Sequence, residues 1–140
     1  MIVRQENIKD YIPHRFPFIM IGNLLHVSKE VFESDFFIDE SNILLKDDFF
    51  QESGLIENIA QTCAASFGYL DRVENEYPRI GFIGAISRLI IHELPPVNSK
   101  INTIVTPTHQ LGNIFMVLGR NFLDGRMLME CEMKIVISES

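Results

Sequence analysis

One long helical pattern stands alone in this sequence and limits the folds that it can adopt. From Gly54 to about Tyr69, apolar residues recur at intervals of three and four, which is the spacing of a helix. The apolar positions are Leu55, Ile56, Ile59, Ala60, Cys63, Ala64 and Phe67. Because Ala65, Ser66 and Gly68 are also small, neighbouring backbone is able to approach closely, and we expect a buried helix rather than a surface one.

Most of the remaining chain has the pattern of β-strands. A short helix is expected within residues 3–12, where Pro13 ends it. Strands are expected at residues 17–27, 31–39, 79–94, 100–110, 113–123 and 126–137. In the last segment apolar residues alternate from Met127 to Ile137, which predicts one buried face. The pair Asp124–Gly125 suits a tight hairpin turn before that strand.

A sheet with one apolar face must be covered, and only the helix at 54–69 is long enough to cover it. An antiparallel sheet curled around this central helix is the simplest arrangement. We therefore predict an α+β fold in a single domain, residues 1–140, which is long enough to bury a core without disulfides.

The composition argues against several classes of partner and cofactor. The formal net charge is −7, and no basic cluster is present, so a nucleic-acid partner is disfavoured. Cys63 and Cys131 lie apart within apolar patterns, and we expect both to be reduced core residues. The absence of a signal core or membrane-spanning run favours a cytoplasmic protein with no membrane partner. No metal-ligand spacing occurs among the histidines and cysteines, so we predict no metal and no cofactor.

Four stretches carry a family resemblance. They are "IKDYIPHRFPFIMIGNLL", "LIENIAQTCAA", "FIGAISRLIIHELPPV" and "DGRMLMECEM". In this order they resemble the 3-hydroxyacyl-acyl-carrier-protein dehydratases of the hotdog fold. The most specific features are "PHRFPF" before an apolar strand and the E-x-x-A-Q pattern that begins at Glu57.

The resemblance implies a sheet wrapped around the central helix, and two protomers that pair their sheets edge to edge as a homodimer or a higher assembly of dimers. It places active sites at the dimer interface and the catalytic acid in the first turn of the helix, at Glu57. The implied substrate is a 3-hydroxyacyl chain on the pantetheine thioester of an acyl carrier protein. Loss of water converts it to the 2-enoyl thioester.

One departure from the family pattern concerns the catalytic base. The usual enzymes have a Gly-His-Phe-Pro-Gly loop between a Phe-Phe pair and the helix, and its histidine is the base. Here Phe50 is followed by "QESG", and no histidine lies between Phe50 and Glu57. This shortened form resembles a subgroup of dehydratases found with aryl-polyene or flexirubin-type pigment synthesis.

Two interpretations of Glu57 remain open. A carboxyl group against apolar neighbours has a raised pKa and is able to protonate a leaving hydroxyl. Alternatively, with Gly54 as N-cap, Glu57 occupies the position of a capping box and bonds back to the Gly54 amide.

The best remaining candidate for the base is His14, because an imidazole titrates in the required range. The alternative is a structural histidine beside Arg15 that shapes the tunnel mouth. The amides of Gly54 and Leu55, at the head of the helix, are candidates for holding the enolate-like oxygen. Gln61 lies one turn beyond Glu57 and is either a support for its carboxyl group, close to the substrate, or a core-edge amide.

Two other functions compete with dehydration. The missing loop histidine suggests a non-catalytic hotdog subunit that completes an active dehydratase, as a heterodimer. A thioesterase is the other alternative, because hotdog enzymes also hydrolyse thioesters with a helix carboxylate.

Several apolar residues are expected to be core or acyl-tunnel lining, namely Phe16, Phe18, Met20 and Phe82. The cations available to dock an acidic carrier protein are Arg15, Arg79, Arg88 and Arg120.

Overall fold

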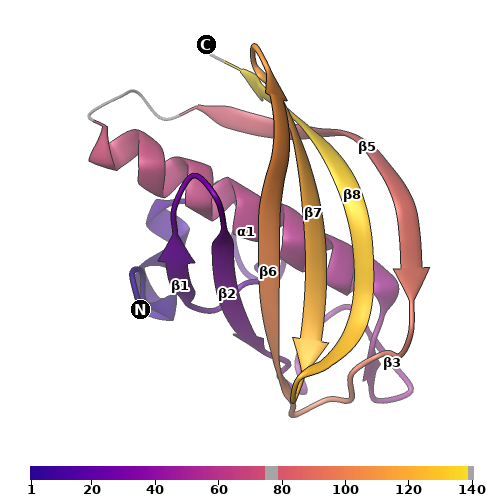
Figure 1. Cartoon of the computed structure of the whole chain (residues 1–140). Coiled ribbons are helices and arrows are strands. Elements are labelled where there is room, and N and C mark those ends of the chain that lie inside the picture. The colour runs from indigo at the N-terminus through magenta and orange to yellow at the C-terminus, as the bar shows by residue number, and fades with distance from the viewer. Residues whose placement is uncertain (75–78, 139–140) are drawn as a thin grey trace.

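The computed structural model describes residues 1–74 and 79–138. A 3-10 helix, η1 (Gln5–Asp10), precedes strands β1 (Leu24–Val27) and β2 (Phe32–Phe37) and the two-residue strands β3 (Leu45–Lys46) and β4 (Phe49–Phe50). The long helix α1 (Glu52–Val73) follows, and then strands β5 (Ile80–Ile91), β6 (Lys100–Leu111), β7 (Ile114–Leu123) and β8 (Arg126–Ser138) complete the fold. Figure 1 shows α1 lying across one face of the curved sheet.

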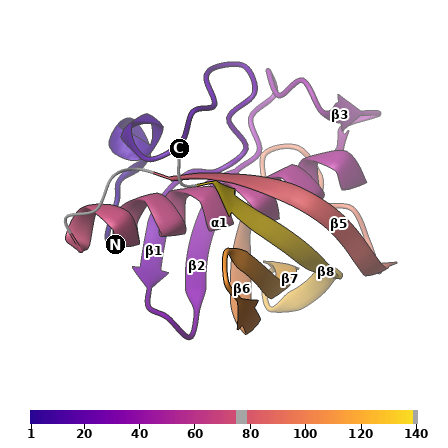
Figure 2. The same cartoon turned by 90° about the horizontal axis from the view of Figure 1, so that it is seen from above.

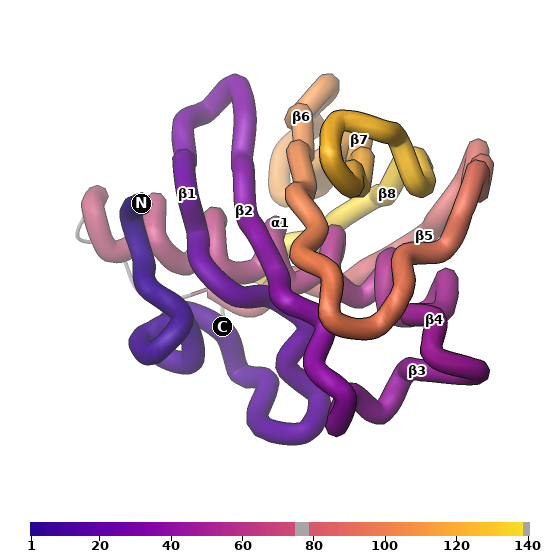
Figure 3. Tube along the Cα trace, turned by 90° about the horizontal axis from the view of Figure 1, so that it is seen from below, coloured from indigo at the N-terminus to yellow at the C-terminus, as the bar shows by residue number. Residues whose placement is uncertain are grey.

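The main sheet has six antiparallel strands in the order β1-β2-β6-β7-β8-β5. The view from above shows α1 between the N-terminal segment and strands β6 to β8 (Figure 2). The strands β3 and β4 form a separate two-stranded sheet that lies outside the main one (Figure 3). This is the predicted architecture of a sheet wrapped around one central helix.

The sheet side of α1 is fully buried. Leu55, Ile59 and Cys63 pack with Val117, Met133 and the other inward residues of the strands in one core cluster. On the other side of the helix, Ala65 packs against Val3, Ile8 and Ile12 of the N-terminal segment. A helix apolar on both sides is what the sequence pattern predicts for an element enclosed between two layers.

Close contact between α1 and the sheet depends on a glycine. A Cβ added at Gly119 on β7 would lie 2.5 Å from Cγ2 of Ile59, closer than carbon atoms pack. The hydrogen atom of Gly119 therefore lets the Ile59 side chain lie directly on the sheet.

The hairpin between β7 and β8 is the predicted one. Asp124 and Gly125 have φ values of 50° and 81°, and Leu123 pairs with Arg126 across the turn. In β8, inward residues alternate from Met129 to Ile137, and both predicted core cysteines are buried as free thiols.

Two predictions about elements are wrong. The expected strand at 17–27 is reduced to β1, because side chains of α1 take up the backbone groups of Met20 that a neighbouring strand would otherwise bind. The expected helix at 54–69 begins two residues earlier and ends four residues later, at Glu52 and Val73. Strands β3 and β4 were not predicted, because two-residue strands carry no periodicity.

Candidate active site

Glu57 lies in the second turn of α1, not the first. Gln51 is the N-cap, its side chain makes no capping bond, and the helix begins at Glu52. The capping-box interpretation is therefore wrong, because Gly54 lies inside the helix and its amide donates to the carbonyl oxygen of Gln51. Its carboxylate instead accepts a hydrogen bond of 2.9 Å from Nε2 of Gln61, one turn further along the helix.

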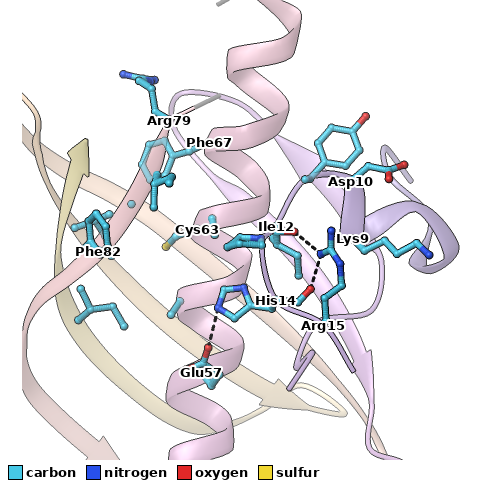
Figure 4. A pocket seen from close by; sticks show the side chains of 18 of the residues that line it. Lys9, Asp10, Ile12, His14, Arg15, Glu57, Cys63, Phe67, Arg79 and Phe82 are labelled. Atoms are coloured by element: carbon cyan, nitrogen blue, oxygen red, sulfur yellow. Dashed lines mark hydrogen bonds and ion pairs between the residues drawn. The ribbon is translucent and has the colours of Figure 1, made fainter. Parts of the chain in front are cut away.

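The second predicted residue of the site, His14, lies opposite this carboxylate. Its Nε2 is 3.4 Å from Oε1 of Glu57 (Figure 4). The two side chains are 31% and 38% exposed, so each has one side toward its partner and another toward solvent. Residues 43 positions apart in the sequence thus form an imidazole–carboxyl pair within one chain.

The loop that carries His14 is held by Arg15. Nη1 of Arg15 donates hydrogen bonds of 2.9 Å and 2.7 Å to the carbonyl oxygens of Ile12 and His14. The other ring nitrogen of His14, Nδ1, is buried and has no hydrogen-bond partner among the described residues. Orientation of the imidazole therefore comes from the backbone of its loop and from Glu57.

The same segment is fixed to α1 a few residues later, at Met20. Its N–H donates to Oε1 of Gln61 at 2.7 Å, and its carbonyl oxygen accepts from Nδ2 of Asn58 at 2.7 Å. Nε2 of Gln61 also donates to the Phe18 carbonyl at 2.9 Å. Gln61 thereby links the loop of His14 to the carboxylate of Glu57, which is the contact that one of its two interpretations expects.

Asn58 extends these contacts into the sheet, and sequence analysis did not identify its role. Its Oδ1 accepts hydrogen bonds from Oγ1 of Thr103 and from Nδ2 of Asn121, and all three residues are fully buried. A buried amide in the core is stable only when its polar atoms are paired. The only sign of this role in the sequence is that Asn58 is a polar residue on the apolar side of a helix.

Gly54 and Leu55 do not have the predicted role. Their amides both donate to the carbonyl oxygen of Gln51, at 2.9 Å and 3.2 Å, so neither is free to hold a substrate oxygen. The glycine is required by the ring of Phe50, since a Cβ at Gly54 would lie 2.3 Å from its Cζ. Gly54 thus accommodates a core aromatic ring rather than a thioester.

A pocket of about 710 Å³ opens beside the pair. Its apolar wall includes Ala60, Cys63, Phe67, Phe82 and Ile135, and its polar side includes His14, Glu57, Arg15 and Lys9. Figure 4 shows Glu57, Cys63 and Phe67 following one another along α1 on this wall. An apolar cavity with an acid and a base at one end suits a chain that carries a reactive polar head.

The four residues predicted to be core or tunnel lining, three phenylalanines and one methionine, lie in different environments in the structure. Phe82 lines the pocket and Met20 is in the core, but Phe16 and Phe18 are 83% and 61% exposed. The predicted docking arginines other than Arg15 lie close to carboxylates, as the pairs Arg79–Asp71, Arg88–Glu132 and Arg120–Glu130.

Burial determines the state of the two thiols. Desolvation, together with the neighbouring Cys131, raises the pKa of the Cys63 thiol from 9.0 to about 12. Desolvation also raises the pKa of Cys131 to about 11. Both thiols are therefore protonated at neutral pH and contribute no nucleophile to the pocket.

Across residues 1–74 and 79–138, no cluster of three or more His, Cys, Asp or Glu side chains is arranged to hold a metal ion. Within the same residues, no helix is long and apolar enough to cross a membrane.

Comparison with solved structures gives the fold a name. The dehydratase heterocomplex ApeI:P from Xenorhabdus doucetiae matches with a TM-score of 0.87 at 14% identity, over 95% of this chain and 91% of that chain. A hypothetical thioesterase with coenzyme A from Streptococcus pneumoniae matches with a TM-score of 0.68 at 9% identity, over 83% and 84%. The PaaI protein of the phenylacetic acid degradation operon of E. coli matches with a TM-score of 0.63 at 7% identity, over 81% and 80%. The architecture is the hotdog fold.

Sequence comparison identifies the family. No curated protein matches the chain. The model of the family described as "ApeP-like: ApeP dehydratase" matches residues 6–110, which include the His14 loop, all of α1 and strand β5. The chain therefore belongs to the ApeP-like dehydratase family.

Proposed function

We propose that this protein removes water from 3-hydroxyacyl thioesters on an acyl carrier protein, with Glu57 as the acid and His14 as the base. The observation that carries the proposal is the 3.4 Å contact between His14 Nε2 and Glu57 Oε1 at the head of an apolar pocket. The loop histidine of the usual 3-hydroxyacyl-acyl-carrier-protein dehydratases is missing here, and in the proposed reaction His14 supplies an imidazole from a different part of the chain.

The reaction moves two protons. His14 takes the proton from the carbon next to the thioester, the bond between the β-carbon and its hydroxyl breaks, and Glu57 protonates the departing oxygen to give water. Since Oε1 of Glu57 accepts the hydrogen bond from Gln61, the acid proton belongs on Oε2. Because both side chains are partly exposed, His14 then gives its proton to solvent and Oε2 of Glu57 takes one from solvent, so that both groups are restored.

Exposed cations on the solvent side of the pocket favour a substrate with an anionic arm. Lys9 and Arg15 line the pocket and are exposed. The phosphate of a phosphopantetheine arm has the charge that these side chains attract. This arrangement is the basis for choosing a pantetheine thioester as the substrate.

A second protomer is part of the proposal, because the edge strand β5 has its apolar side chains uncovered. All of its residues are exposed, and Arg88 is its one charged residue. An apolar edge of this length invites pairing with another strand. We propose that β5 pairs with β5 of a second copy to give a homodimer. Ile80 to Ile83 also line the pocket, so the second copy would lie beside the site.

A non-catalytic subunit is the second candidate function. It is favoured by the similarity to a chain of a heterocomplex and by the missing loop histidine. In this case β5 would pair with a related hotdog subunit, and the chain alone would not turn over. Thioester hydrolysis is the third candidate. The structural match to a thioesterase shows that this chain has the same fold, and it gives no evidence for the reaction.

One experiment separates the three functions. The purified chain is incubated with a 3-hydroxyacyl-acyl carrier protein, and both the enoyl product and free thiol are measured. Dehydration predicts enoyl product from the chain alone, and hydrolysis predicts free thiol. A non-catalytic role predicts neither product until a complete dehydratase is added, and that result would end the proposal of an acid–base pair in this chain.

A further inference from the structure

The wall of α1 that faces the pocket carries small side chains between two large ends. Glu57, Ala60, Cys63, Ala64 and Phe67 line the pocket at helical spacing. Because ten residues of helix rise by about 15 Å, Phe67 lies about that far from Glu57 along the axis. The small residues between them leave room for a chain to lie along the helix.

Phe67 also lines a second pocket, of about 430 Å³. Phe32 and Phe115 line the second pocket and not the first. Both pockets therefore meet at Phe67, and the second continues along the chain with Leu70 and Glu74.

The Phe67 ring is held in place rather than free to swing. It packs edge-on against Phe32 with centroids 5.4 Å apart, and against Phe115 with centroids 4.9 Å apart. It is only 7% exposed. Arg79 lines both pockets beside this ring and is paired with the buried carboxylate of Asp71 at 2.6 Å. An apolar chain end that reached this point would meet a fixed aromatic ring and a charged pair.

We propose that Phe67 is the specificity residue that limits the length of the acyl chain, and that the second pocket is closed to substrate by its ring. The proposal rests on the proposed function for the direction of the chain, with its thioester at Glu57 and His14. About 15 Å corresponds to about twelve bonds of an extended chain, at about 1.2 Å per bond. Chains longer than this would have to displace the ring.

The test measures binding apart from turnover. Unreactive alkyl thioethers of pantetheine, in a series of increasing chain length, are titrated into the whole protein by calorimetry. In the wild type, affinity rises by about fourfold for each added methylene until the chain reaches Phe67, and then stops rising. In Phe67→Ala, the rise continues into longer chains.

Two further variants guard against a folding defect. Phe67→Leu removes less packing, and is expected to shift the limit in the same direction by a smaller amount. Phe115→Leu removes the same volume as Phe67→Leu from the same aromatic cluster, but only from the second pocket. It should leave the limit where it is, because the Phe67 ring keeps its edge-on contact with Phe32. A wild type with no limit, a limit unchanged in both Phe67 variants, or the same shift in Phe115→Leu would overturn the proposal.

Turnover of the matching 3-hydroxyacyl thioesters is measured in parallel. If the binding limit moves as expected while no enoyl product forms, the proposed function fails and the role of Phe67 as a length limit stands. If product forms with no dependence on Phe67, the dehydratase assignment stands and the role of Phe67 is refuted.

Discussion

At the scale of single residues, the protein places one imidazole 3.4 Å from one carboxyl group and supports the carboxyl group from behind. Gln61 is fully buried, and its side-chain Nε2 donates to Glu57. The same amide also holds the segment that carries His14, because its Oε1 accepts from the Met20 N–H and its Nε2 donates to the Phe18 carbonyl. Any movement of the loop therefore changes the distance between the imidazole of His14 and the carboxyl group of Glu57. Gln61 is a positioning residue in this account, and it lies behind Glu57 rather than in the pocket.

The first prediction concerns the pair itself. Glu57→Gln and His14→Asn should each reduce kcat/KM for dehydration by about 10²-fold or more, because each removes one proton-transfer group. Both side chains are partly exposed, so the urea unfolding midpoint should change little. Glu52→Gln, which changes an exposed carboxyl group in the first turn of the same helix, is the control and should keep full activity. Full activity in Glu57→Gln would remove its assigned role.

The second prediction follows from the buried thiols. Since burial raises the pKa of Cys63 from 9.0 to about 12, the folded chain keeps a proton that the unfolded chain loses in this range. The resulting contribution to the free energy of unfolding is complete below about pH 9 and declines as the pH rises toward 12. Urea unfolding near pH 7 and at about pH 10.5 should therefore show a smaller loss of stability in Cys63→Ala than in the wild type. Equal losses in the two proteins would contradict the assigned burial.

At the scale of elements, the fold depends on how closely α1 approaches β7. In Gly119→Ala the new methyl group would lie 2.5 Å from Ile59, whose side chain is fully buried and has no space to move. We expect a loss of about 1–3 kcal/mol in the free energy of unfolding, measured by urea denaturation. The matched control is Gly84→Ala on β5, where the nearest atom is Cδ of the flexible Lys134, at 3.2 Å. There we expect a change of about 0.5 kcal/mol or less. Equal effects at both positions would argue against the close packing.

Elements with a strong period were predictable from the sequence, and those shaped by tertiary contacts were not. Alternation identified β8, and the pair Asp124–Gly125 identified its turn, because both are local properties of the chain. The segment around Met20 looked like a strand, but Asn58 and Gln61 from a distant helix bind its backbone. Nothing within the segment itself signals those partners.

The same difference applies to the site. Glu57 and His14 were identified as candidates by residue type and resemblance, and their contact appeared only in the folded chain. The start of α1 was misplaced because its first residues, Glu52 and Ser53, are polar and lie outside the apolar pattern. This error of two residues placed Glu57 in the first turn and the amides of Gly54 and Leu55 at a free helix end, which they are not.

At the scale of the whole molecule, the uncovered edge strand β5 is the most exposed apolar feature of the sheet. Its large apolar residues with 40% exposure or more are Ile80, Phe82, Ile83, Ile86, Leu89 and Ile90. If β5 forms the dimer interface, Ile83→Lys combined with Ile90→Lys should give a monomer by sedimentation, because a charge would be buried at each position. Leu111→Lys, at an 80% exposed position away from β5, is the control and should remain a dimer. A double variant that stays dimeric would exclude this edge as the interface.

If the acid and the base belong to the same chain, variants that each lack one of the two groups cannot restore each other's activity, and a mixing experiment shows whether they do. Purified Glu57→Gln and His14→Asn chains are unfolded together, refolded together, and compared with the wild type for formation of enoyl thioester. With both groups on one chain, we expect an active wild type and an inactive mixture, because every chain in the mixture lacks one member of its own pair. Activity recovered in the mixture would place the two groups on different chains, and an inactive wild type would show that this pair does not carry out the elimination.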